Sequence, residues 1–162
     1  MSPDGRWLHV SLVRQRLTLL EGRGTLAVWP VSTGTAGAGE RQGSGATPRG
    51  WHHIRARIGA ELPADAVLVG RRPTGERYSP ALAAQHPGRD WILGRILWLS
   101  GLEVGRNRLG GCDTMRRYIY IHGAPPEVPL GRALSHGCVR MHPEAVVALF
   151  DRVGPGTRVL LE

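Results

Sequence analysis

The segment ALSHGCVRMH contains one of only two cysteines in the 162-residue chain. This cysteine, Cys138, directly follows a His-Gly pair, and a second pair, His122-Gly123, ends the apolar run YIYIHG further upstream. A thiol reacts as its thiolate, so a catalytic cysteine needs a neighbouring base or cation, and an imidazole titrates near neutral pH. These residue types predict a cysteine nucleophile assisted by a histidine.

Two histidines could act as the base. His136 lies two residues before Cys138, where it shares a face on an extended segment but is poorly placed for a linear hydrogen bond. His122 stands at a strand end and can approach from another element, so we expect it to be the base and His136 to contact substrate. Gly123 and Gly137 would let the backbone approach a substrate carbonyl, and amides near Gly137 and Cys138 could form an oxyanion hole.

Two other interpretations compete with thiol catalysis. A single cysteine is often a buried apolar residue that packs like a small hydrophobe. Alternatively, His122, His136, Cys138 and His142 could supply four ligands to a metal ion. Zinc motifs pair closely spaced ligands in two sets, and His136-x-Cys138 has a poor chelate bite, which counts against a metal site. Spacing alone leaves thiol catalysis and metal binding both open.

Composition fits one domain spanning residues 1–162. The 23 glycines and 12 prolines are typical of a turn-rich, mostly β protein. All 21 basic residues are arginines and the net charge is +8, but they are scattered and form no basic run. This pattern argues against a nucleic-acid partner and suits an anionic small substrate, because arginine grips carboxylates with paired hydrogen bonds.

The N-terminus does not resemble a secretory signal, because Arg14 and Arg16 interrupt the apolar run. No stretch has the roughly 18 apolar residues of a membrane span. We therefore expect a cytoplasmic protein that does not bind membranes, or a periplasmic one if the true start lies upstream. In the cytoplasm a disulfide between Cys112 and Cys138 is not expected, so Cys138 should be a free thiol.

The elements that must position these residues are mostly strands. Apolar or alternating runs predict strands at residues 7–21, 24–34, 51–59, 91–101, 116–123 and 157–162. The first two should be joined by a tight turn in which Gly22 and Gly24 have positive φ. Residues 61–91 are turn-rich, with a weakly helical pattern around 80–85, and Pro143 begins a short helix that a Gly-Pro-Gly sequence ends.

Residues 32–50 form a glycine-rich segment that is too long for a simple connector. It is either a functional loop or a solvated flexible one.

The segment HGAPPEVPLGRALSHGCVRM resembles the signature of the L,D-transpeptidase (YkuD-domain) family, a His-Gly followed by Ser-x-Gly-Cys and often Arg. The resemblance continues in RQRLTLLE, in PVSTG and TPRG, and in the closing GTRVLLE. It implies a mostly β, single-domain, sandwich-like fold with one short helix after the catalytic cysteine. The family often has a threonine or serine where Ala124 stands, and Cys112 matches no family motif and should be structural.

The resemblance also implies a site and a reaction. Cys138 would be the nucleophile and His122 its base, with Ser135, His136, Gly137, Gly123 and Arg140 lining the site and no cofactor. Cys138 would attack the L-centre carbonyl of diaminopimelate in a peptidoglycan tetrapeptide or muropeptide and expel D-alanine. Carbapenem-type β-lactams would acylate the same thiol.

The fate of the acyl-enzyme defines the role. Because no export signal is seen, we expect an L,D-carboxypeptidase acting on soluble muropeptides during recycling. The alternatives are an L,D-transpeptidase that forms cross-links or exchanges D-amino acids, and a non-enzymatic binding module. Arg140 is expected to read the terminal carboxylate of the substrate, or otherwise to pair with Glu144.

Overall fold

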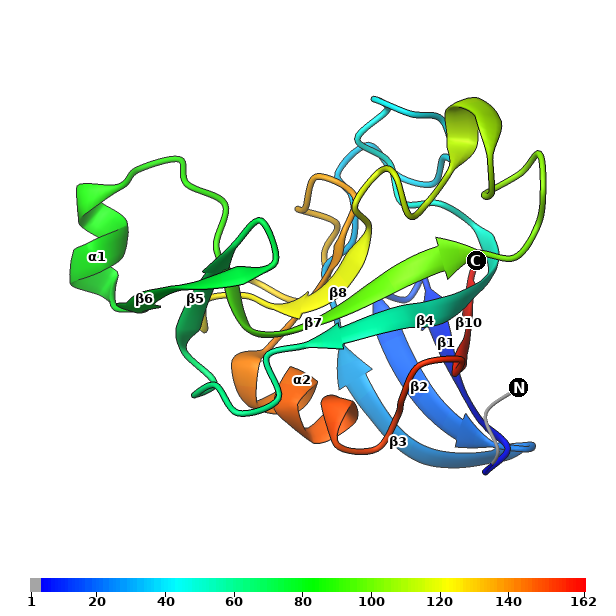
Figure 1. Cartoon of the computed structure of the whole chain (residues 1–162), viewed down its shortest axis with the longest axis horizontal. Helices are drawn as coiled ribbons and strands as arrows, with labels where there is room; N and C mark the ends of the chain where they lie inside the picture. The colour runs from blue at the N-terminus through cyan, green and yellow to red at the C-terminus, as the bar shows by residue number, and fades with distance from the viewer. Residues whose placement is uncertain (1–3) are drawn as a thin grey trace.

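A computed structural model describes residues 4–162 and shows a mostly β protein (Figure 1). The strands are β1 (Arg6–Ser11), β2 (Arg16–Glu21), β3 (Gly24–Pro30), β4 (Gly50–Ile58), β5 (Ala66–Val69), β6 (Arg72–Arg77), β7 (Ile92–Gly101), β8 (Tyr120–Gly123), β9 (Val139–Met141) and β10 (Arg158–Leu161). The helices are α1 (Pro80–Gln85), α2 (Pro143–Phe150) and the short 3₁₀ turn η1 (Gly110–Cys112).

All these strands belong to one hydrogen-bonded sheet with the order β3-β2-β1-β10-β4-β7-β5-β6. The long strand β7 is the branch point, because it pairs antiparallel with β4, β5 and β8. Strand β8 in turn pairs in parallel with β9. The two strands that carry the chemical motifs therefore lie side by side.

The main core is built from residues of the sheet and of α2, and α2 packs against β7 and β8. It forms because alternate residues of each strand point to the same face of the sheet. Ile121 of β8, and Val139 and Met141 of β9, point into this core and are completely buried. Leu149 and Phe150 of α2 close it from the helix side.

Several predicted elements are confirmed. The strands expected at 51–59, 91–101 and 157–162 correspond to β4, β7 and β10. The strand expected at 116–123 is shorter, because residues 114–118 form turns and only Tyr120–Gly123 is β8, and the one expected at 24–34 ends at Pro30. Helix α2 follows Cys138 and begins at Pro143, and α1 covers the weakly helical stretch. The mostly β fold is confirmed, and both cysteines are free.

The N-terminal prediction was wrong in detail. The run expected as one strand at 7–21 is two antiparallel strands, β1 and β2. The chain reverses in a turn at residues 12–15, where Gln15 has a φ of 53°. In the next turn Gly22 has a positive φ of 58°, whereas Gly24 does not, since it already begins β3.

The β5–β6 hairpin was missed within the turn-rich region. Its two-residue turn, Gly70-Arg71, has positive φ at both positions, as the tight turns that suit strand twist require. An arginine is an unusual residue at such a position, so no hairpin was predicted there.

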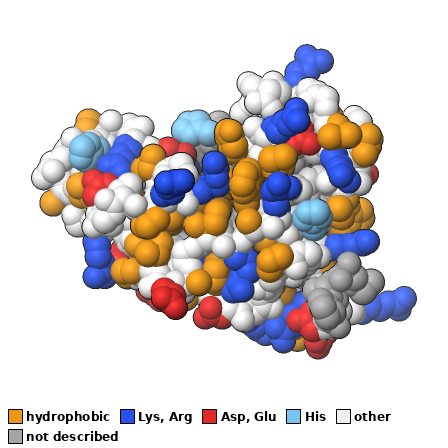
Figure 2. Space-filling view, in the orientation of Figure 1, with side chains coloured by type: hydrophobic (Ala, Val, Ile, Leu, Met, Phe, Trp, Pro, Cys, Tyr) orange, Lys and Arg blue, Asp and Glu red, His pale blue; other side chains and the backbone are white. Residues whose placement is uncertain are grey.

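The overall surface agrees with the composition. Figure 2 shows basic side chains spread over the visible face and interspersed with apolar and acidic ones. Within residues 4–162, neither α-helix is long and apolar enough to cross a membrane.

Candidate active site

The register of three strands places the chemical residues on one face of the sheet. His122 of β8 lies opposite Arg140 of β9 and opposite Ile96 of β7. Cys138 directly precedes β9, which puts it beside Tyr120. Because the alternate residues of β8 and β9 fill the core, these side chains face the other way. The parallel β8–β9 pairing thus brings the predicted nucleophile and base to the same face.

The Cys138 thiol is only partly exposed and packs against Tyr120, Leu68 and Ile96. Its Sγ accepts a hydrogen bond from the Tyr120 amide at 3.3 Å and donates to the Tyr118 carbonyl at 3.4 Å. Burial raises the pKa of the thiol to about 11, although the Tyr120 hydrogen bond opposes this shift. The resting thiol is therefore protonated at neutral pH, and a base must remove its proton during attack.

His122 is suited to that task. It is buried, and its Nδ1 lies 2.7 Å from the Gly123 carbonyl oxygen. A carbonyl only accepts, so we assign the proton to Nδ1, which leaves Nε2 as a free acceptor. Burial lowers the pKa of His122, while the Gly123 hydrogen bond and the charge of Asp90 counteract part of this effect. The imidazole is neutral at rest and able to take a proton.

Gly123 is a glycine for a packing reason. A Cβ at this position would collide with the Leu93 carbonyl of β7. The next residue, Ala124, is buried and its amide donates to the Met141 carbonyl at 2.9 Å. Both residues therefore hold β8 against its neighbours.

The loop before Cys138 is organised by Ser135. The buried Ser135 hydroxyl accepts from the Gly137 amide at 3.1 Å and donates to the Cys138 carbonyl at 2.6 Å. The Gly137 amide, one of the two expected oxyanion donors, is thus already engaged. The Cys138 amide has no acceptor among the described residues, so it is the better oxyanion donor.

The glycine-rich segment 32–50 is a rigid support for this loop. The buried Thr47 hydroxyl accepts from the Gly34 amide at 2.8 Å and donates to the Gly137 carbonyl at 2.9 Å. Gly137 has a φ of 126°, which side-chain-bearing residues rarely adopt. Ser135 also exchanges backbone hydrogen bonds with this segment. Of the two interpretations of the segment, a functional loop is the one these contacts favour.

Arg140 and His136 flank the nucleophile differently from expectation. Arg140 pairs with Asp90, Nη2 to Oδ1 at 3.0 Å, and donates to the Leu134 carbonyl at 3.2 Å. The salt bridge expected as the alternative role of Arg140 is therefore present, but the acid is Asp90 and not Glu144. The His136 side chain is 83% exposed, and its Nδ1 lies 3.9 Å from Asp90 Oδ2. Asp90 precedes an apolar strand and belongs to no motif, so sequence reasoning missed it.

The tip of the β5–β6 hairpin contacts the residues next to Cys138. Arg71 at its tip donates to the Tyr120 hydroxyl at 2.8 Å. Its guanidinium also stacks on the rings of Trp98 and Tyr118, 4.7 and 5.0 Å from the ring centres. These contacts secure the hairpin over the strand that lies beside Cys138.

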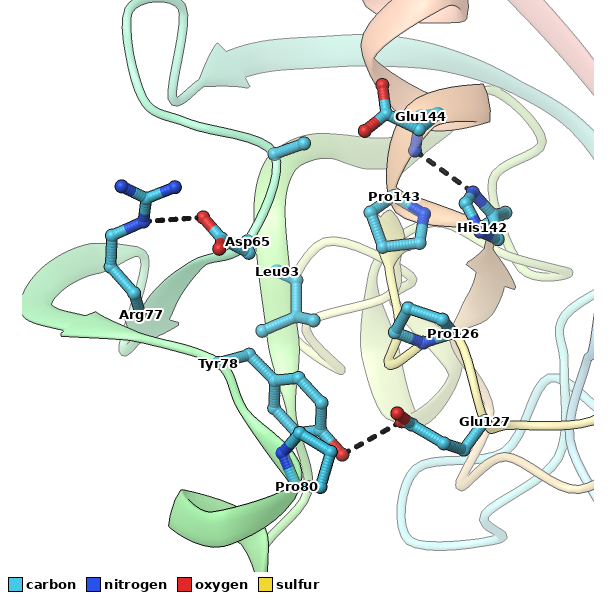
Figure 3. Close-up of a pocket in the computed structure, with 11 residues that line it drawn as sticks. Asp65, Arg77, Tyr78, Pro80, Leu93, Pro126, Glu127, His142, Pro143 and Glu144 are labelled. Atoms are coloured by element: carbon cyan, nitrogen blue, oxygen red, sulfur yellow. Dashed lines mark hydrogen bonds and ion pairs between the residues drawn. The ribbon is translucent and has the colours of Figure 1, made fainter.

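Two cavities lie on either side of the loop 125–128. The smaller, about 140 Å³, adjoins the nucleophile loop, and its wall contains Asp90, Trp91, His136 and Arg140. The larger, about 400 Å³, is shown in Figure 3, and none of the predicted catalytic or substrate-binding residues lines it.

His142 lies at the larger cavity, whereas His136 lies at the smaller one. The ring of His142 lines the larger cavity, and its Nδ1 accepts from the Glu144 amide at 3.2 Å, which caps α2 (Figure 3). Within residues 4–162, no three histidine, cysteine or acidic side chains are gathered in a metal-binding arrangement. This geometry does not favour the four-ligand metal site.

Comparison with known proteins agrees with the fold. Residues 5–161 match the L,D-transpeptidase catalytic domain, YkuD. The chain is 49% identical to YqjB of Bacillus subtilis strain 168 over 48 residues, which are 30% of this chain and 27% of that protein. The chain therefore belongs to the L,D-transpeptidase catalytic-domain (YkuD) family.

Solved structures show the same fold at low identity. The LD transpeptidase LdtMt1 in complex with imipenem has a TM-score of 0.58 and 20% identity, over 98% of this chain and 59% of that one. The L,D-transpeptidase from Xylanimonas cellulosilytica DSM 15894 has a TM-score of 0.56 and 23% identity, over 99% and 62%. The chain thus spans about three fifths of the length of these structures.

Proposed function

We propose that this chain is a cysteine-dependent L,D-carboxypeptidase that releases D-alanine from peptidoglycan tetrapeptides, in particular soluble muropeptides. The observation that carries the proposal is the placement of Cys138 and His122 on one sheet face, with Nε2 of His122 free to accept a proton. Family membership supports a peptidoglycan substrate.

The reaction follows from these groups. His122 Nε2 takes the thiol proton as Cys138 Sγ attacks the L-centre carbonyl of diaminopimelate. The Cys138 amide stabilises the resulting oxyanion. Collapse breaks the peptide bond, and His122 returns the proton to the departing amine of D-alanine. Water, deprotonated by His122, then attacks the thioester and releases the tripeptide and the thiol.

Water as the acceptor is supported by the small volume beside the nucleophile. The adjoining cleft of about 140 Å³ is well below the roughly 300 Å³ at which pockets begin to enclose larger ligands. A water molecule needs no further binding surface, whereas a second stem peptide does.

Transfer to an amine is the second candidate, and the larger cavity favours it. Glu127 and Glu144 line that cavity, and their carboxylates would attract an ammonium-bearing acceptor such as a stem peptide or a D-amino acid, whereas Asp65 there is already paired with Arg77.

The decisive experiment weighs the products. We expect purified protein to convert a disaccharide-tetrapeptide into disaccharide-tripeptide plus free D-alanine, with the same products when an amine acceptor is added. Cys138→Ala should abolish turnover while keeping the fold, and Cys112→Ala, which removes the other thiol, should retain it. A cross-linked or exchanged product would show that the enzyme is a transferase, and would overturn the proposed carboxypeptidase activity. Full turnover by a folded Cys138→Ala protein would refute the nucleophile assignment.

A β-lactam offers an independent test of the thiol. A relative binds imipenem, a carbapenem whose strained ring carbonyl a thiolate can attack. Imipenem should add its mass once to the wild-type protein and not to Cys138→Ala.

A further inference from the structure

The cleft beside the nucleophile contains a carboxylate that the reaction above does not use. Asp90 lies between α1 and β7, and its Oδ1 is held by Arg140 at 3.0 Å. The other oxygen, Oδ2, lies 3.9 Å from Nδ1 of His136, beyond hydrogen-bond distance. The Asp90 side chain is 46% exposed, so one of its oxygens is fixed and the other is open to the cleft.

Arg140 is poorly placed to be the ligand-reading group of this pair. Its side chain is only 13% exposed, and it already donates to Asp90 and to the Leu134 carbonyl. These contacts orient the guanidinium toward Asp90 and leave it covered. Within the pair, Arg140 therefore positions the carboxylate, and Asp90 presents the accessible charge.

The position of Asp90 also bears on the reacting groups. Its negative charge raises the pKa of both His122 and Cys138. At Cys138 this effect on the pKa is larger than the opposing effect of Arg140. A carboxylate near a nucleophilic thiol disfavours the thiolate. A bound cation on Asp90 would cancel this effect, so the residue suits recognition of a positively charged substrate.

We propose that Asp90 is the specificity residue that binds an ammonium group of the peptide donor, next to the bond that is cleaved. The cleft of about 140 Å³, with Trp91 and Pro125 as apolar walls, fits the end of one amino-acid side chain. The matching ligand class is a diamino acid whose side chain ends in an ammonium and a carboxylate. The proposal rests on the proposed function, because it concerns the donor of that reaction.

The test compares two tetrapeptides that differ only in this ammonium. One contains meso-diaminopimelate as its third residue, and the other contains L-2-aminopimelate, which keeps the side-chain carboxylate and lacks the distal amine. The readout is kcat/KM for D-alanine release. We expect the wild-type protein to prefer the diaminopimelate peptide by about 10- to 100-fold, the range of a charge-assisted hydrogen bond.

Asp90→Asn should lose this preference. The kcat/KM of this variant should fall by about 10- to 100-fold on the diaminopimelate peptide and should not fall on the aminopimelate peptide, because the charge that disfavours the thiolate is removed. Asp90→Glu should recover part of the preference. Asp151→Asn, an exposed acid at the end of α2, is the matched control and should behave as wild type on both peptides.

The outcomes separate the two proposals. Release of D-alanine from neither peptide by the wild-type protein would overturn the proposed function. Equal turnover of both peptides by the wild-type protein would overturn the role of Asp90 alone. Equal losses on both peptides in a folded Asp90→Asn protein would do the same, because Asp90 would then only hold Arg140 in place.

Discussion

At the scale of single residues, the two candidate bases differ in burial and in hydrogen bonding. His122 is buried, with Nδ1 fixed by the Gly123 carbonyl and Nε2 free. His136 is exposed and has only Asp90 within ion-pair distance among the described residues. A general base needs a fixed orientation and an unprotonated nitrogen, and His122 has both.

We therefore expect His122→Ala to reduce kcat/KM by about 100-fold or more, the usual loss when a general base is removed. His136→Ala should cost clearly less, because this ring is not oriented by the protein. D-alanine release by both variants across pH 5 to 9 would measure the difference. A larger loss in His136→Ala would reverse the assignment of base and substrate contact.

At the scale of elements, the glycine-rich segment and the nucleophile loop act as one unit. Thr47 links them through the Gly34 amide and the Gly137 carbonyl, both in a buried environment. A buried polar group that loses its partner costs more than the hydrogen bond itself contributed. The position of Cys138 thus depends on a residue far away in the sequence.

Thr47→Val preserves the shape of the side chain and removes both hydrogen bonds. We expect it to lower the free energy of unfolding by about 1–3 kcal/mol and to reduce kcat, because the Gly137 backbone is no longer fixed. Thr47→Ser keeps the hydroxyl and should retain most of the wild-type stability and kcat. Urea unfolding and steady-state kinetics would provide the values. Wild-type kcat in a folded Thr47→Val protein would show that Thr47 does not position the nucleophile loop.

At the scale of the whole molecule, a buried histidine links β4 to the segment that precedes β8. His52 is fully buried, with Nδ1 3.0 Å from the Gly50 carbonyl and Nε2 2.9 Å from the Thr114 hydroxyl. Burial lowers the pKa of His52 from 6.5 to about 4, although the hydrogen bond to Gly50 opposes the shift. The folded protein therefore disfavours the protonated ring.

The consequence is a stability that depends on pH. The unfolded chain binds this proton below about pH 6.5 and the folded chain only below about 4, so stability is complete above 6.5 and falls as the pH drops toward 4. The contribution is roughly 3 kcal/mol. Urea unfolding at pH 7 and pH 4 should show a smaller loss for His52→Asn than for the wild type. Exposed His86→Gln is the control, and equal losses in all three proteins would contradict this role.

The sequence alone determined the chemistry and much of the secondary structure. The Ser-His-Gly-Cys segment and the upstream His-Gly pair are local patterns, and so are the alternation of β4 and the proline that begins α2. Each depends on neighbouring residues only, and so each was predictable. The β5–β6 hairpin was not, because an arginine, Arg71, occupies the second turn position with positive φ, where glycine is usual.

Only the tertiary structure decided which residues act together. Asp90 meets Arg140 across 50 positions, and Thr47 meets Gly137 across 90. Arg71 reaches Tyr120 across 49 positions. No local periodicity encodes such contacts, because they arise when β7 pairs with three other strands and brings distant segments to one face. The sequence therefore predicted the nucleophile and its base, and the fold added the residues that hold them and those that we propose select the substrate.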